Sequence, residues 1–98
     1  MEKTITLTGT VMAFEWSNPH CVVHMDVMTD RGGVQHWLIE LAAPAHMARA
    51  GWSKNSIKSG DQIIADTHPA KNGATVGTSG VQNNILKFVI NGVELPGR

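Results

Sequence analysis

The fold is decided by a short helical segment, PAHMARAG (residues 44–51), that lies between runs of strand-forming residues. Pro44 stands at a first helical position, where its missing N–H costs nothing, and Gly51 is a typical helix stop. An alternating apolar run, Val34–Leu41, precedes this helix, and a further run, Gln62–Thr67, follows it. A helix between the third and fourth strands separates an OB-fold from a plain β-sandwich, which would lack it.

Two more strands are predicted upstream of this helix. Thr4–Trp16 alternates threonines with apolar residues and is rich in β-branched side chains. Gly9 interrupts it, and a glycine inside a strand marks a bulge or tight bend of the kind that curls a sheet into a barrel. His20–Met28 is the second strand, and residues 29–33 form the turn into the third.

Downstream, residues 68–80 are rich in glycine and threonine and are predicted to form a long loop. Asn84–Ile90 is the predicted fifth strand, and Asn91-Gly92 is a strong hairpin signal that returns the chain into residues 93–95. The sequence therefore predicts an all-β fold: one OB-fold-like, five-stranded Greek-key barrel spanning residues 1–98, with one short helix between strands 3 and 4.

Composition narrows the function classes. Eight basic and eight acidic residues give a formal net charge of zero, so the basic footprint of a nucleic-acid-binding protein is absent. No apolar run reaches the roughly 18 residues that span a bilayer, which predicts no membrane insertion. A near-zero net charge favours association, so a homodimer is one expected state.

The hairpin of the second and third strands carries the candidate chemistry. Matching their apolar faces places Asp26 opposite His36, His24 opposite Leu38, and Val22 opposite Glu40. Directly opposed Cβ atoms lie about 4.5–5.5 Å apart, so imidazole and carboxylate groups could converge on Cu²⁺ or Zn²⁺. The candidate metal ligands on the outward face are His20, His24, Asp26, His36 and Glu40.

A second interpretation stays open, in which these residues are only the polar side of a half-exposed sheet, because antiparallel sheets normally expose one polar face to water.

Other types of site have less support from the sequence. Cys21 is the only cysteine, which excludes an intramolecular disulfide and a cysteine-based zinc cage, and its strand position points it toward the core. The five methionines lie mostly on apolar faces, which predicts core packing rather than thioether copper ligands.

The stretch WSNPH (residues 16–20) forms a rigid corner before the second strand. Asn18 precedes a proline and is pushed toward extended geometry, while Trp16 is large enough to pin the corner by burial. Trp37 and Trp52 are the other two tryptophans, and Trp52 is expected to cover one end of the core. Trp16, Asn18, Trp37 and Trp52 are thus candidates for a structural corner or for ligand contact.

Several spaced elements occur together: Trp16-x-Asn18-Pro19-His20, Trp37-x-x-Glu40, Pro44, Gly51-Trp52, Lys58-x-Gly60-Asp61 and the segment at residues 69–73. As a set they resemble an uncharacterised family of small exported bacterial OB-like proteins with a Glu-Trp-x-Asn-Pro-His signature. The resemblance implies a periplasmic or secreted β-barrel and supplies no reaction. Residues 1–8 lack a signal peptide, so a complete chain would be expected in the cytoplasm.

Three functions follow as hypotheses. The leading one is a small non-enzymatic binding module that holds a transition-metal ion, Cu or Zn, or a small ligand on the face of strands 2 and 3. The second is a protein–protein interaction or homodimerisation module that docks through the tryptophan-rich corner. The third is a small metal-dependent oxidative enzyme, which would need an open coordination position.

Overall fold

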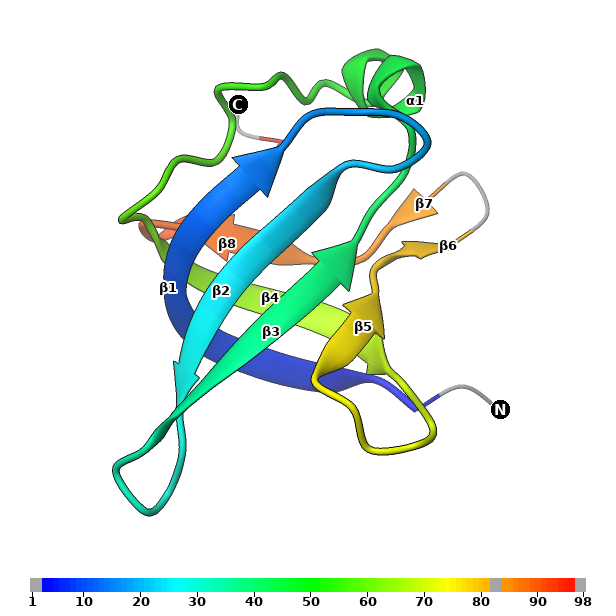
Figure 1. Cartoon of the computed structure of the whole chain (residues 1–98). Coiled ribbons are helices and arrows are strands. Elements are labelled where there is room, and N and C mark those ends of the chain that lie inside the picture. The colour runs from blue at the N-terminus through cyan, green and yellow to red at the C-terminus, as the bar shows by residue number, and fades with distance from the viewer. Residues whose placement is uncertain (1–2, 82–83, 97–98) are drawn as a thin grey trace.

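The computed structural model describes residues 3–81 and 84–96, which form a β-barrel with one short helix (Figure 1). Its elements in chain order are β1 (Ile5–Glu15), β2 (Val22–Met28), β3 (Val34–Glu40), α1 (Pro44–Arg49), β4 (Gln62–Pro69), β5 (Val76–Thr78), β6 (Gly80–Val81), β7 (Asn84–Ile85), β8 (Phe88–Ile90) and β9 (Val93–Leu95). No helix in this part of the chain is long and apolar enough to cross a membrane.

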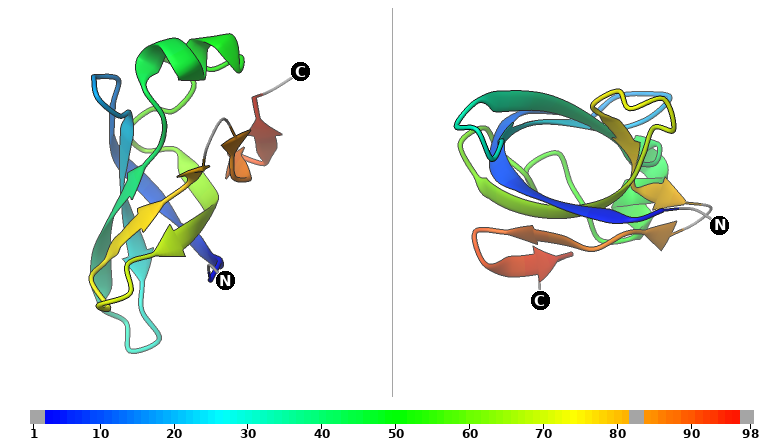
Figure 2. Two further views of the ribbon diagram at one scale, coloured as in Figure 1. Left: turned by 90° about the vertical axis from the view of Figure 1, so that its right-hand side faces the viewer. Right: turned by 90° about the horizontal axis from the view of Figure 1, so that it is seen from below.

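The barrel strands follow the order β1-β2-β3-β5-β4, and β4 pairs with β1 to close the ring. The β3–β5 pairing is parallel, and the other barrel pairings are antiparallel. Seen along its axis, the ring of strands is closed (Figure 2). With α1 between β3 and β4, this is the predicted OB-like barrel, and the prediction is confirmed.

The strand that completes the ring differs from the predicted one. β5 lies in the stretch that was predicted as a long loop up to Gly80, and it bridges β3 and β4. The predicted fifth strand, Asn84–Ile90, is divided into β7 and β8, and β8 instead pairs with β4 and β9. β5 escapes recognition because it has only three residues, with Gly77 at its centre.

Gly9 lies where β1 passes from one neighbouring strand to the other. It is paired with Val27 of β2 and with Ile63 of β4. A Cβ atom at Gly9 would lie 1.9 Å from the carbonyl oxygen of Asp26, so the two backbones approach too closely for any side chain. Gly9 therefore permits a close approach of two strands, and the predicted bulge does not lie at Gly9 itself.

The irregularity in the β1–β2 register lies three residues further on. Val11 is paired with Met25 and Ala13 with His24, which leaves Met12 as the additional residue of a β-bulge. The bulge reverses the alternation, so that Phe14 packs against the core after Leu7 and Val11. The bulge thus accounts for a change of phase in the sequence, in which the large apolar residues of this strand occupy odd positions up to Val11 and even positions from Met12 to Trp16.

The core fills the barrel and continues under α1. Met47 of α1 is fully buried, and Trp52 stacks edge-on against Phe88 with ring centroids 5.7 Å apart. Trp52 is 4% exposed, which confirms that it covers one end of the core. Asn91 and Gly92 both have positive φ, as the predicted hairpin into β9 requires.

One buried polar atom in this core has no hydrogen-bond partner in the described part of the chain. The Thr67 hydroxyl lies on β4 beneath Gly77 of β5 and forms no hydrogen bond with the described residues. A buried hydroxyl without a partner carries its full desolvation penalty. We expect Thr67→Val, which keeps the shape, to raise the free energy of unfolding by about 1 kcal/mol. Urea denaturation measures this change, and a less stable variant would show that the hydroxyl is satisfied in solution.

Candidate functional site

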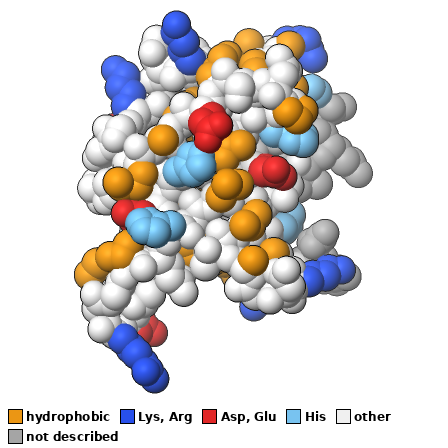
Figure 3. Space-filling model, in the orientation of Figure 1, with side chains coloured by type: hydrophobic (Ala, Val, Ile, Leu, Met, Phe, Trp, Pro, Cys, Tyr) orange, Lys and Arg blue, Asp and Glu red, His pale blue; other side chains and the backbone are white. Residues whose placement is uncertain are grey.

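The outer face of β1, β2 and β3 is hollowed beside the start of β5. Histidine, acidic and apolar side chains lie close together on this side of the molecule (Figure 3). The hollow has a volume of about 610 Å³. Its lining contains apolar side chains, two histidines and one carboxylate, with no lysine or arginine: Met12, Ala13, His24, Met25, Asp26, His36, Trp37, Leu38, Thr75 and Val76. We call this surface the histidine face. Its groups favour a neutral or cationic ligand over an anion.

The β2–β3 register places these side chains as the sequence predicted. Asp26 is paired with His36, His24 with Leu38, and Val22 with Glu40. Because side chains alternate along a strand, His24 and Asp26 share the outer face while Met25 is 1% exposed in the core. The prediction of the hairpin register is confirmed.

Each histidine of this face is held by a carboxylate. His36 donates a hydrogen bond from Nδ1 to Asp26 Oδ1, and His24 donates one from Nε2 to Glu15 Oε2. A carboxylate only accepts hydrogen bonds, so each bonded ring nitrogen carries a proton. In a neutral imidazole the other nitrogen then has its lone pair free: Nε2 in His36 and Nδ1 in His24.

The five predicted metal ligands are not gathered at one point. Asp26 and His36 are in contact, and His24 lies on the same face but binds Glu15. His20 is exposed in the loop that follows the cis Asn18–Pro19 bond, outside the hollow. Glu40 is half-buried, opposite Val22. Within residues 3–81 and 84–96, no three His, Cys, Asp or Glu side chains form a group that could hold a metal ion.

Sequence reasoning missed Glu15 as a partner of His24. Glu15 is paired with Val22 in the β1–β2 register. Val22 lies two residues before His24 on the same face of β2, so Glu15 is a diagonal neighbour of His24. A strand with strict alternation would have placed Glu15 with the core-facing residues Leu7 and Val11. The signal that could have found it is the change of phase after Gly9, because a one-residue bulge turns Glu15 outward.

The prediction that methionines pack in the core is wrong for two of them. Met25 and Met47 are buried as predicted, whereas Met12 is 51% exposed and Met28 is 70% exposed. Met12 follows the core-facing Val11 and points outward by simple alternation, as Thr6 and Thr8 do, and Met28 is the last residue of β2, on the same outer face as Asp26. Both line a second hollow of about 640 Å³ next to the first.

The tryptophans serve mainly as packing groups. Trp16 is half-buried against the core and meets Phe14 edge-on at a centroid distance of 6.0 Å. Trp37 is 9% exposed, and its Nε1 donates a hydrogen bond of 3.2 Å to Gln35 Oε1. Trp37 alone of the three lines the histidine face, whereas Asn18 is exposed outside it.

Cys21 has no access to this face. Its side chain is fully buried at the start of the β2–β3 pairing. Burial raises the pKa of the Cys21 thiol, and a hydrogen bond with the backbone of Ser17 opposes this shift. The thiol is therefore neutral at physiological pH, which removes it as a nucleophile or thiolate ligand in the folded protein.

One protein-family model matches most of the chain. The model of a family of unknown function matches residues 1–81, which include the whole barrel and the histidine face. The chain belongs to the DUF6152 family. The DUF6152 match confirms membership of an uncharacterised family, and the exported location stays a prediction. No curated protein and no solved structure matches the chain significantly.

Proposed function

We propose that this DUF6152 protein is a small non-enzymatic binding module that takes a transition-metal ion or small ligand on its histidine face. The observation that carries the proposal is the pair of carboxylate-held imidazoles beside an apolar hollow. A carboxylate that accepts one ring N–H fixes the tautomer and raises the basicity of the other nitrogen, as in the surroundings of metal-bound histidines.

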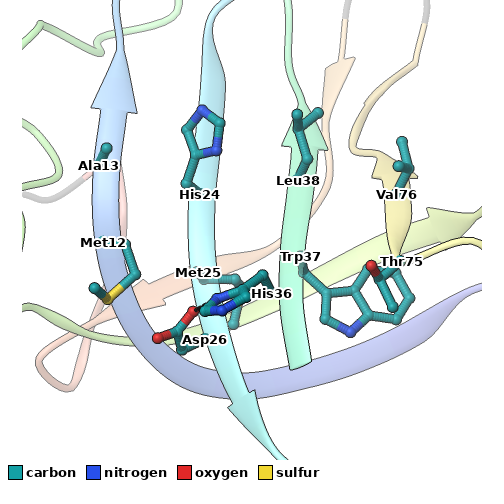
Figure 4. A pocket seen from close by; sticks show the side chains of 10 residues that line it. All are labelled: Met12, Ala13, His24, Met25, Asp26, His36, Trp37, Leu38, Thr75 and Val76. Atoms are coloured by element: carbon teal, nitrogen blue, oxygen red, sulfur yellow. Dashed lines mark hydrogen bonds and ion pairs between the residues drawn. The ribbon is translucent and has the colours of Figure 1, made fainter. Parts of the chain in front are cut away.

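The position of these groups also supports binding. The Asp26 side chain is 24% exposed and is backed by the sheet, whereas the His36 side chain is 81% exposed. The anchoring carboxylate is thus partly shielded while the imidazole that it orients faces solvent. Figure 4 shows the His36 ring beside the Asp26 carboxylate. A ligand can reach the free nitrogen without any rearrangement of the barrel.

The test is a calorimetric titration of metal-free protein with Cu²⁺, Zn²⁺ and Ni²⁺, and with Cu⁺ under anaerobic conditions. We expect one ion to bind stoichiometrically with a dissociation constant below about 1 μM and to raise the melting temperature by mass action. The double variant His24→Ala, His36→Ala should lose this binding, and His46→Ala, which alters a histidine of α1, should keep it. Absence of binding for all four ions, or equal binding by the double variant, would contradict metal binding on this face.

A second candidate is an interaction module, because the histidine face and the second hollow next to it expose several large apolar side chains. Met12, Met28, Val34 and Val76 are between 38% and 70% exposed. Such a patch is also typical of a surface that associates with itself or with a partner. Light scattering tests self-association. A homodimer that dissociates in the Val34→Lys variant would support the interaction module, and a monomeric wild-type protein would contradict self-association.

A further inference from the structure

We infer that two copies of this chain pair through the open edge of β3, with residues 34–36 of one copy antiparallel to residues 34–36 of the other. The inference rests on the second candidate function, for which it names a second copy of the chain as the partner, and it does not depend on metal binding. It starts from the pairing of β3, which extends over seven residues with β2 and over three, residues 38–40, with β5.

The backbone groups of Val34 and His36 point toward the side of β3 that β5 does not reach. The N–H of Leu38 donates a hydrogen bond of 3.1 Å to the Thr75 carbonyl, so Leu38 directs its backbone groups away from β2. This direction alternates along a strand, and the β2–β3 register is unbroken. The N–H and C=O groups of Val34 and His36 therefore also face away from β2, where no strand of the described chain is paired with them.

This edge is accessible to another molecule. In Figures 1 and 2 the hairpin that joins β2 to β3 projects beyond the rest of the barrel. The residues at its β3 side are exposed: Val34 is 53% exposed, and Gln35 and His36 are exposed as well. A second strand can therefore approach the unpaired groups without any rearrangement of the barrel.

The sequence of this edge lacks the features that normally prevent edge pairing, which are charged residues, proline, bulges and very short strands. The edge strand β9 has such features, since it consists of three residues with Glu94 at the centre and is followed by Pro96. In contrast, residues 34–37 contain no lysine, arginine, carboxylate or proline, and they lie in a regular register. The unpaired part of β3 is therefore suited to pairing.

A second copy fits this edge because its own unpaired groups have the same spacing. When two such strands run antiparallel about a twofold axis at Gln35, Val34 of each copy lies opposite His36 of the other. Residues that face each other in this way exchange both an N–H and a C=O, so the unpaired groups of both copies are satisfied together. An unrelated peptide would satisfy one such edge, whereas a second copy satisfies two.

Charge and apolar surface agree with this partner. The formal net charge of each copy is zero, so no net repulsion opposes association. Val34 is paired with Met28, which is 70% exposed, and a strand added beside β3 covers part of this apolar surface. The histidine faces of the two copies then lie next to each other on one continuous sheet.

The experiment is sedimentation equilibrium of the full chain at concentrations from roughly 1 μM to 1 mM, because an interface of this small size is expected to be weak. Val34→Pro removes an N–H that faces away from β2, at the first position of β3, where a strand accepts proline. It should weaken the dimer by about 100-fold, since each of the two lost hydrogen bonds contributes up to about tenfold. Val34→Ala keeps the N–H and should weaken the dimer by less than about tenfold.

Amide hydrogen exchange of the wild-type protein locates the interface without any variant. On raising the protein concentration, exchange should slow by at least about tenfold at Val34 and His36, whose N–H groups enter the new pairing. Exchange at Gln35 and Trp37, whose N–H groups face β2, should not change with concentration. This readout keeps the test decisive even if Val34→Pro fails to fold.

Three results would overturn the inference: a monomer at the highest concentration, equal weakening by Val34→Pro and Val34→Ala, or exchange at Val34 and His36 that does not depend on concentration. A dimer that survives Val34→Pro and dissociates in Val34→Lys would leave the interaction module standing without edge pairing. A monomer would also remove self-association as a function. The metal titration is independent of all these outcomes.

Discussion

Replacing Gly9 with alanine is expected to destabilise the barrel by about 3 kcal/mol, at the upper end of the usual range for overpacking. The new Cβ would lie 1.9 Å from the Asp26 carbonyl oxygen and 2.9 Å from its carbonyl carbon. Both are backbone atoms, so no side-chain rotation relieves the clash. β1 cannot move away either, because Gly9 is paired with β2 on one side and with β4 on the other.

Urea denaturation measures the effect through a lower midpoint at an unchanged slope. Gly33→Ala is the matched control, since its Cβ would meet only the side-chain oxygen of Thr29 at 3.3 Å. The control should change stability by less than about 0.5 kcal/mol, as surface substitutions usually do. Equal midpoints for Gly9→Ala and the wild-type protein would show that the two strands separate more easily than the register implies.

Phe88→Ala is expected to cost about 4 kcal/mol, as does removal of other fully buried aromatic rings. Phe88 is 0% exposed on β8, it contacts the ring of Trp52, and it is paired with Ala65 of β4. Its deletion leaves a cavity between the barrel and the segment that follows α1. Phe88 also lies beyond the part of the chain that the DUF6152 family model matches.

Thermal unfolding followed by circular dichroism tests whether β8 belongs to the same cooperative unit as the barrel. Phe88→Ala should lower the melting temperature in a single transition, whereas Val93→Ala, at a position 53% exposed on β9, should have little effect. A variant with wild-type stability would mean that the C-terminal hairpin packs independently of the barrel.

The fold was predictable where local signals and side-chain alternation agree. The apolar periodicity of β2 and β3 determines their register, and Pro44 and Gly51 bound α1 within two residues of its observed ends. β5 could not be predicted, because a three-residue strand with a central glycine has no periodicity to detect. Its pairing depends instead on the space that Gly77 leaves above Thr67.

The part of the candidate site on the β2–β3 hairpin was predictable from the sequence, whereas the part on β1 was not. The Asp26–His36 contact follows from strand pairing alone. The Glu15–His24 contact depends on one additional residue in β1, which a sequence pattern signals only as a change of phase. A bulge moves every later side chain of its strand to the opposite face, so one local irregularity determines which residues line the site.

The attachment of β5 also affects how the protein fluctuates. This strand joins the ring through three residues on β3 and two on β4, whereas the β2–β3 pairing extends over seven residues. Local opening of a native protein begins where the fewest bonds must break. Val76 of β5 and Leu38 of β3 face each other across this seam and both line the hollow. We therefore expect β5 to separate from the ring before any other strand, which would widen the hollow and let a ligand lodged between β3 and β5 exchange with solvent at the rate of this opening.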